Sequence, residues 1–421
     1  MIDHPQRYAM ANELHARPFP VLEAPARAAY LALKPAEGTA RDLAAERAHL
    51  IDLLDRFDAP HPQPGATHWF GRIGRHWLKW ESHTEFVTFL VFGPGLDGRP
   101  FDPAEFGVFP AAWLEAAPGV RVTSALIRVA QETDDEAIAA TCGAWFEAES
   151  LALSRVLDDE LVVAADFRID PAGHMRLAVF ARPGTGPARI GRVVQRLCEI
   201  ETYKALSMLG LFQARALGPA LDGLEARLTR LVAGLGGSTA SAEETLKALL
   251  AISGELEDMA ARSSFRFGAT GAYAQIVGQR IDVLHEQRFL GRQTFGEFMM
   301  RRYDPAMRTV RATERRLATM AERALRAGDL LRTRVDVERS AENQALLASM
   351  DRRADLQLRL QHTVEGLSVV AISYYAVNLV LYLAAPFAGV LGKGALAALV
   401  TPPVILAVWL GVRRIRRRVA H

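Results

Sequence analysis

Cysteine is scarce in this chain of 421 residues, which contains only Cys142 and Cys198. Neither belongs to a CxxC pair or has histidines at metal-ligand spacing, which argues against a zinc ribbon, an iron–sulfur site or a disulfide framework. We therefore expect two buried thiols in a reducing compartment.

Familiar catalytic signatures are also missing. The sequence has no GxSxG, no Walker-type phosphate loop, no HExxH pair and no GxGxxG after a predicted strand. The usual motifs of hydrolases, nucleotide-binding proteins and metalloproteases are therefore absent. The chain also lacks an excess of one charge, because its 50 Lys and Arg residues are nearly balanced by 48 Asp and Glu residues. These absences favour a protein that is not an enzyme, and the charge balance argues against nucleic-acid binding.

Long apolar runs are absent from the N-terminus. Charged and polar residues interrupt its first 20 residues throughout, so this segment is predicted to be neither a secretory signal nor a membrane span. Residues 366–392, in contrast, are 27 residues without a charge, and about 20 suffice to cross a bilayer. The next apolar stretch, 395–412, contains Pro402 and Pro403. The sequence predicts a C-terminal transmembrane hairpin in the lipid bilayer.

Arginine placement predicts the orientation of this hairpin. The cluster that follows the second span is of the stop-transfer type and consists of Arg413, Arg414, Arg416, Arg417 and Arg418. Three more arginines flank the first span, at 352, 353 and 359, whereas the intervening turn offers only Lys393. Because positive charge is retained on the cytoplasmic side, we expect a bacterial inner-membrane protein with both termini in the cytoplasm.

Residues 1–187 have the pattern of a cytosolic α/β domain. Strands are predicted at 28–34 and 121–129, a hairpin at 161–167 and 175–180, and helices at 42–57 and 134–147. This alternation favours a sheet covered by helices.

The sequence divides the rest of the chain into three predicted parts. Residues 188–365 are a helical stalk region, residues 366–412 are the hairpin, and residues 413–421 are a basic cytosolic tail. A break at 234–241 precedes helices predicted at 242–262 and 272–289. Residues 305–364 predict one helix of about 90 Å that enters the membrane. Neighbours must bury its apolar side chains, namely Leu317, Leu331, Val335, Leu346, Leu347, Met350 and Leu360. Those neighbours are the preceding helices or other copies, which makes a homo-oligomer through the long helix the expected assembly.

Ionisable residues alternate in the strand-like run 75–92, where Lys79, Glu81, His83 and Glu85 share one face. Two carboxylates beside an imidazole fit a divalent cation or acid–base chemistry, particularly if His15 or Glu13 folds alongside. The alternative is a solvated face of an edge strand. The opening segment around Asn12, Glu13 and Arg17 precedes two prolines and predicts a structural clamp across the domain.

Polar residues also recur inside the first predicted span. Ser368, Tyr375, Asn378 and Tyr382 follow one another at steps of seven, three and four residues, which places them on one stripe of a helix. Such a stripe either lines a pore in a homo-oligomer or forms a hydrogen-bonded seam between the two helices of the hairpin.

Four motifs together resemble the bacterial membrane-anchored proteins of the domain-of-unknown-function 3422 family. They are NELHARPFP at 12–20, WESHTEF at 80–86, NQALL at 343–347 and TVEGLS at 363–368. The resemblance covers essentially the whole chain and implies a membrane anchor without a defined activity. The architecture also resembles the CorA-type magnesium transporters, in which five copies form a pore. Those transporters carry a Gly-Met-Asn motif. The nearest match in this chain is YAVN at 375–378, which has the Asn but lacks the Gly and the Met.

Three functional hypotheses follow from the sequence. The first is a homo-oligomeric CorA-like cation channel whose path is lined by the stripe through Asn378. The second is a membrane-tethered binding or scaffold module. The third is a tethered metal-dependent enzyme that requires His15, Glu81, His83 and Glu85 to converge on one ion.

Overall fold

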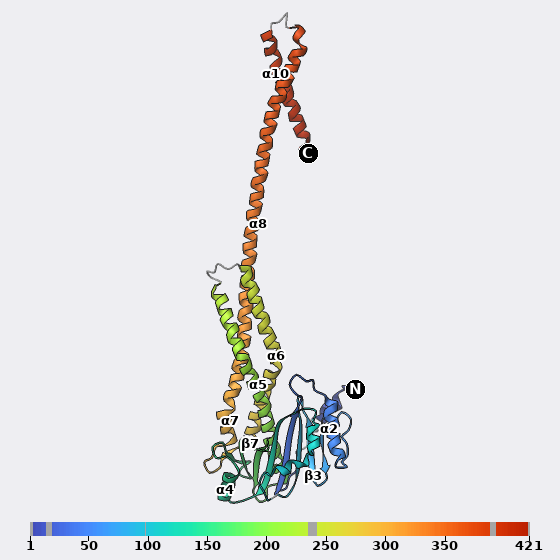
Figure 1. Cartoon of the computed structure of the whole chain (residues 1–421), viewed down its shortest axis with the longest axis vertical. Coiled ribbons are helices and arrows are strands. Elements are labelled where there is room, and N and C mark those ends of the chain that lie inside the picture. The colour runs from blue at the N-terminus through green and yellow to red at the C-terminus, as the bar shows by residue number, and fades with distance from the viewer. Residues whose placement is uncertain (1–2, 14–18, 97, 235–241, 388–392, 420–421) are drawn as a thin grey trace. The chain divides into compact units, whose positions relative to one another are not determined.

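The computed structural model describes residues 3–13, 19–96, 98–234, 242–387 and 393–419. It separates into two compact units. One unit comprises Met1–Ser238 with Lys247–Ala327, and the other Thr239–Leu246 with Gly328–His421. Figure 1 shows the elements of both.

A nine-stranded sheet organises the first unit, in the order β2-β3-β4-β1-β5-β8-β7-β6-β9. Neighbouring strands are antiparallel except β5 and β8, which are parallel. The strands are β1 (Ala26–Lys34), β2 (His68–Ile73), β3 (His76–Ser82), β4 (Val87–Pro94), β5 (Val120–Gln131), β6 (Ala152–Val156), β7 (Leu161–Ile169), β8 (Met175–Ala181) and β9 (Gln287–Arg288). The predicted α/β class, the strands near 28–34 and 121–129, and the β7–β8 hairpin are confirmed.

Both faces of the sheet are covered, because alternate side chains of each central strand feed two separate cores. One core packs against short helices: α2 (Leu43–Asp55), the 3₁₀ helix η1 (Pro103–Val108), α3 (Ala111–Glu115) and α4 (Asp135–Trp145). The other packs against α5 (Pro187–Gly234), the C-terminal part of α6 (Ala242–Asp282) and α7 (Phe295–Arg302). Both cysteines are buried and reduced, as expected.

One helix, α6, replaces the two helices predicted at 242–262 and 272–289, and that prediction is wrong. Gly268 and Gly271 lie in or next to the gap between the two predicted helices, and glycine in a helix interior costs up to about 1 kcal/mol. Packing overrides this cost here, because Thr270 is buried against α5 and its hydroxyl donates to the Ser207 carbonyl at 3.3 Å. After a turn at Gly291, α7 begins at Phe295, and its N-terminus has a Thr294–Glu297 capping box.

The extended segment before β1 is held against the start of α5. The Leu22 amide donates to the Pro187 carbonyl at 3.2 Å, and Pro20 and Leu22 are buried. Gly191 makes this approach feasible, because a Cβ added there would lie 1.8 Å from the Pro20 carbonyl oxygen. The short helix α1 (Arg7–Glu13) precedes this segment.

The second unit contains the C-terminal helices. Helix α8 (Asp304–Leu383) begins in the first unit and runs without interruption through the predicted stalk and into the first apolar stretch. After η2 (Ala385–Phe387), helix α10 (Lys393–Val419) contains Pro402 and Pro403. Part of the first predicted span, 388–392, lies outside the described residues.

Two helices in the described part of the chain, α8 and α10, are long and apolar enough to cross a membrane. Only 6% of each apolar window is buried within the structure, and neither window is near the N-terminus. Buried core helices and signal sequences do not have this combination of properties. The apolar helices therefore indicate membrane association.

His49, on α2, is a buried neutral side chain. Its ring stacks on Trp113 with centroids 3.9 Å apart, and its Nε2 atom has no hydrogen-bond partner among the described residues. Burial lowers the pKa of His49 from 6.5 to about 4.

Substituting Gly191 tests the contact with the N-terminal segment. Gly191→Ala should lower the midpoint of thermal unfolding of the full-length protein in detergent, because overpacking costs about 1–3 kcal/mol. Gly218→Ala is the matched control on the same helix, since a Cβ there meets no atom within 4 Å. Equal midpoints for the two variants would contradict the contact.

Acidification tests the burial of His49. The unfolded chain binds more protons than the folded chain between pH 6.5 and about 4, so stability falls as the pH falls through this window, by about 2 kcal/mol at pH 5. His49→Phe retains the stacked ring but does not titrate. Thermal unfolding at pH 7.5 and 5.0 should show a smaller pH-dependent loss for the variant, and an unchanged loss would rule out the assignment.

Candidate functional site

The ionisable run 75–92 is not one strand, as predicted, but two strands joined by a turn at residues 83–86. Only Lys79 and Glu81 therefore follow the period of β3, and Glu85 lies in the turn. Strand β3 lies between β2 and β4, and Lys79 is only 3% exposed. The alternative of a solvated edge strand is therefore also wrong.

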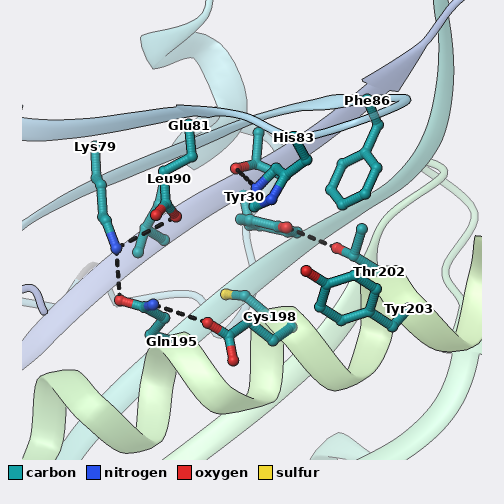
Figure 2. Close-up of a pocket in the computed structure, with 12 residues that line it drawn as sticks. Tyr30, Lys79, Glu81, His83, Phe86, Leu90, Gln195, Cys198, Thr202 and Tyr203 are labelled. Carbon is teal, nitrogen blue, oxygen red and sulfur yellow. Dashed lines mark hydrogen bonds and ion pairs between the residues drawn. The ribbon is translucent and has the colours of Figure 1, made fainter. Parts of the chain in front are cut away.

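Lys79 ends in a buried polar network above α5 (Figure 2). Its Nζ atom donates to Gln195 Oε1 at 2.7 Å and lies 3.2 Å from Glu81 Oε2. Gln195 in turn donates to Glu199 at 2.8 Å, and Glu199 is paired with Arg280 on α6. Each charge has an opposite partner, which is the condition for placing such groups between a sheet and a helix.

A small cavity lies beside this network (Figure 2). Its volume is about 20 Å³, and Tyr30, His83, Cys198 and Tyr203 are among the residues that line it. Such a volume accommodates about one water molecule, far less than a metabolite. Burial raises the pKa of the Cys198 thiol well above its ordinary value, so this cysteine is poorly suited to act as a nucleophile.

The turn after β3 is fixed by a single arginine from the segment before α2. The Arg41 guanidinium donates to the main-chain carbonyls of His83, Thr84 and Phe86 and to the Ser82 hydroxyl, and it pairs with Glu46. The His83 ring stacks on Phe86 with centroids 4.3 Å apart. This turn belongs to the WESHTEF segment, whose backbone is therefore held in place by side-chain hydrogen bonds.

Glu85 connects that turn to α6. Its two carboxylate oxygens accept hydrogen bonds from Arg266 at 3.0 and 2.7 Å, and Lys34 Nζ lies 3.8 Å away. Burial alone would raise the pKa of Glu85, but hydrogen bonds from Arg266 and Tyr273 and the nearby positive charges lower it. We call these four residues, Lys34, Glu85, Arg266 and Tyr273, the turn–α6 clasp.

A metal centre is not assembled by these side chains. Among the residues that the structure describes, no group of three or more His, Cys, Asp or Glu side chains is arranged to hold a metal ion. Glu81 faces Lys79 and Glu85 faces Arg266, so both carboxylates are engaged by cations of the protein itself. His15 lies outside the described residues.

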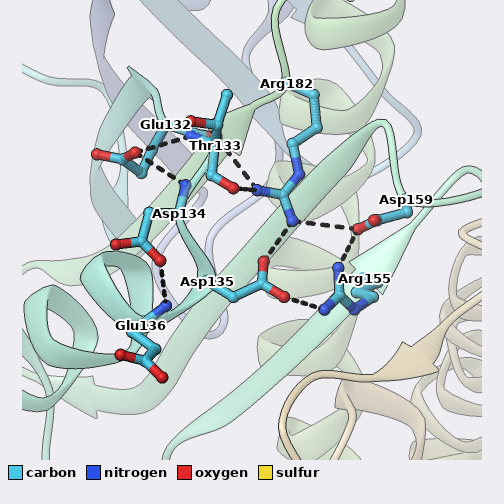
Figure 3. Close-up of polar contacts among 8 residues, drawn as sticks. All are labelled: Glu132, Thr133, Asp134, Asp135, Glu136, Arg155, Asp159 and Arg182. Atoms are coloured by element: carbon cyan, nitrogen blue, oxygen red, sulfur yellow. Dashed lines mark hydrogen bonds and ion pairs between the residues drawn. The ribbon is translucent and has the colours of Figure 1, made fainter.

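Sequence reasoning missed a second ionic network near the start of α4 (Figure 3). The Asp135 carboxylate pairs with Arg155 of β6 and with Arg182 after β8, and both arginines also pair with Asp159. The pKa of Asp135 is lowered, because the hydrogen bonds and charges of the two arginines outweigh the opposing effect of desolvation. The network connects three elements that are distant in sequence, so local spacing gives no signal of it.

The polar stripe of the first span is exposed on one side of α8. The side chains of Ser368, Tyr375 and Tyr382 are exposed, and Asn378 is half-buried. Ser373, half a turn away from the stripe, is 6% exposed, so α8 is covered on the side opposite the stripe at this level. The hairpin itself thus leaves three of the four stripe residues uncovered.

Several predicted residues lie outside what the structure describes. These are Arg17 and the side chains of Asn12, Glu13, Arg416, Arg417 and Arg418. Arg413 and Arg414 belong to α10, and the Arg413 guanidinium lies 4.9 Å from the centre of the Trp409 ring.

The chain belongs to the family described as "Protein of unknown function (DUF3422)", whose model matches residues 2–419. No curated protein and no solved structure matches the chain. The expected family is confirmed, whereas the architectural resemblance to CorA-type transporters stays a prediction.

Removing the charge of Glu85 tests the turn–α6 clasp. Glu85→Gln removes the buried negative charge that pairs with the half-buried Arg266 and should destabilise the protein by roughly 3 kcal/mol. Glu255→Gln is the control, because its pair with Arg227 also joins α5 and α6 but is about half exposed and should cost less than about 1 kcal/mol. Chemical unfolding at pH 7 measures both losses, and similar values would show that the clasp is not a major contact.

Proposed function

We propose that this member of the DUF3422 family is the subunit of a homo-oligomeric inner-membrane protein that conducts a cation along a path lined by its first spans. In this proposal the copies associate in parallel through α8, the N- and C-termini are cytoplasmic, and the assembly is CorA-like. The arginine-rich flanks of the two apolar stretches support the orientation.

The observation that carries the proposal is a row of exposed apolar side chains on α8 outside the apolar stretch. We call this row the apolar face, and Arg339, Glu342 and Arg353 lie on the same side of the helix. Leu346, Met350 and Leu360 are 60%, 58% and 66% exposed, in a segment whose charges exclude it from the bilayer interior. With 3.6 residues per turn, these side chains and Val364 share one face, while Asp355 lies opposite. Apolar side chains exposed to water favour a partner that covers them.

The apolar face and the polar stripe lie on the same side of α8. Eighteen residues make five complete turns, so Val364 follows Leu346, Tyr382 follows Val364, and Asn378 follows Leu360 at the same angular position. Copies that associate through the apolar face therefore bring the polar stripes of their spans toward a common axis.

The chemistry of the stripe favours protein or water over lipid. Hydrocarbon offers no partners for the hydroxyl groups of Tyr375 and Tyr382 or for the Asn378 amide. Ser368 differs, because its hydroxyl donates to the Val364 carbonyl at 2.8 Å. The oxygens of Tyr375, Asn378 and Tyr382 are neutral ligands of the kind that a hydrated or partly hydrated cation accepts.

Ion flux tests the proposal. The full-length protein reconstituted into vesicles should admit Mg²⁺ or K⁺, and Asn378→Leu should reduce the flux by at least about tenfold, since an apolar side chain raises the electrostatic barrier in the path. Ser373→Ala is the control, because this buried hydroxyl lies on the opposite side of α8 and has no partner among the described residues.

Native mass spectrometry in detergent gives the assembly state in the same preparation. A monomer without flux would overturn the proposal and leave a membrane-tethered binding or scaffold module. An oligomer without flux of either ion would retain the assembly but refute conduction.

A further inference from the structure

Tandem prolines in α10 leave one main-chain carbonyl without a partner in its own helix. A helical carbonyl accepts a hydrogen bond from the N–H group four residues ahead or, in a tighter turn, three residues ahead. For Leu399 these positions are Pro403 and Pro402, and proline has no N–H group. Neither kind of helical hydrogen bond can therefore satisfy the Leu399 carbonyl, although α10 continues through both prolines.

This carbonyl lies on the exposed side of α10 and deep in its apolar stretch. Leu399 is 71% exposed, and Pro402 and Pro403 are exposed too. The charges that bound the stretch, Lys393 and Arg413, are about 9 Å and about 21 Å away along the helix. Hydrocarbon at this depth supplies no hydrogen-bond donor, so an unpaired carbonyl there is strongly unfavourable.

The first span carries a donor that also lacks a partner. Tyr374 is 66% exposed, and its hydroxyl makes no hydrogen bond with any residue that the structure describes. At about 100° per residue, it lies between the polar stripe at Tyr375 and the covered side at Ser373. It is about 12 Å from Gly366 and about 14 Å from Leu383 along the helix, so its hydroxyl reaches neither end of the span. This hydroxyl needs an acceptor within the membrane.

We propose that the Tyr374 hydroxyl of each copy donates a hydrogen bond to the Leu399 carbonyl of the next copy in the homo-oligomer. This inference rests on the proposed function and names the contact between neighbouring hairpins. Tyr374 lies about 14 Å from Leu383 and Leu399 about 9 Å from Lys393, measured from the ends of the helices that face each other across the turn. The length of a tyrosine side chain covers the difference in depth.

The arrangement of donor and acceptor favours a ring of copies. A donor on one surface and an acceptor on another form a heterologous contact, which closes into a ring when the copies are related by rotation. The contact uses none of the stripe residues Tyr375, Asn378 and Tyr382, so these remain available to line the path. A hydrogen bond between membrane helices is modest in itself, but this one pairs two groups that lipid leaves without partners.

A double-mutant cycle on the full-length protein tests the pairing. Tyr374→Phe removes the donor and should weaken self-association at least about threefold, measured by native mass spectrometry across a dilution series in detergent. Pro403→Ala gives the Leu399 carbonyl an N–H group from its own helix, so adding Tyr374→Phe to this background should weaken association no further. Pro402→Ala is the matched control, because its N–H group pairs with the Ala398 carbonyl and the effect of Tyr374→Phe should be retained.

Disulfide formation between copies gives a second readout that a folding defect cannot imitate. Chains that carry Tyr374→Cys or Leu399→Cys, each with its own affinity tag, are co-expressed and oxidised in native membranes. The two natural cysteines are buried and should not take part. Mixed covalent dimers should exceed the dimers that either variant forms with itself.

Three results would overturn the pairing while a homo-oligomeric conductor still stands. They are unchanged association of Tyr374→Phe, an equal effect of this change in the Pro402→Ala and Pro403→Ala backgrounds, and mixed dimers no more abundant than dimers of one variant. A monomeric unaltered chain would instead refute the proposed function itself.

Discussion

A single helix, α8, has one part suited to water and another suited to lipid, and the function proposed for the protein depends on how the helix accommodates both. Helix α8 starts in the packed body, where Leu317 and Met320 are buried, and ends in an apolar stretch suited to lipid. Between these regions it carries both charges and exposed leucines. Lipid excludes the charges and water disfavours the leucines. Association with further copies eases both constraints, because it covers the apolar face and leaves charged side chains elsewhere on the helix in water.

The cytosolic body uses its ionisable residues for cohesion. Lys79 is stabilised by Gln195 and Glu81 between the sheet and α5, and Glu85 fastens the turn after β3 to α6. These groups are the most suggestive of chemistry in the sequence, yet each is occupied by an opposite charge. They rigidify the support from which α8 emerges, and function is assigned to the helix rather than to them.

The sequence predicted those features that have a local period. Alternating side chains indicated β1, β5 and the β7–β8 hairpin, and the charge-free stretch that begins at Gly366 indicated the first apolar helix. Features that depend on distant partners were missed. The turn at His83 is fixed by Arg41 and α6 is continuous because Thr270 packs on α5, and neither contact can be read from spacing. The same limit applies to the site: the stripe through Asn378 is periodic, whereas the pairing of Glu85 with Arg266 joins residues 181 positions apart.

Disulfide cross-linking in native membranes tests the central claim most directly. The two natural cysteines are buried and should not interfere. A cysteine at Leu346, on the apolar face of α8, should form covalent dimers of the chain under mild oxidation, while a cysteine at Asp355, on the opposite face, should not. Cross-linking that is absent at both positions, or equal at both, would contradict association through the apolar face.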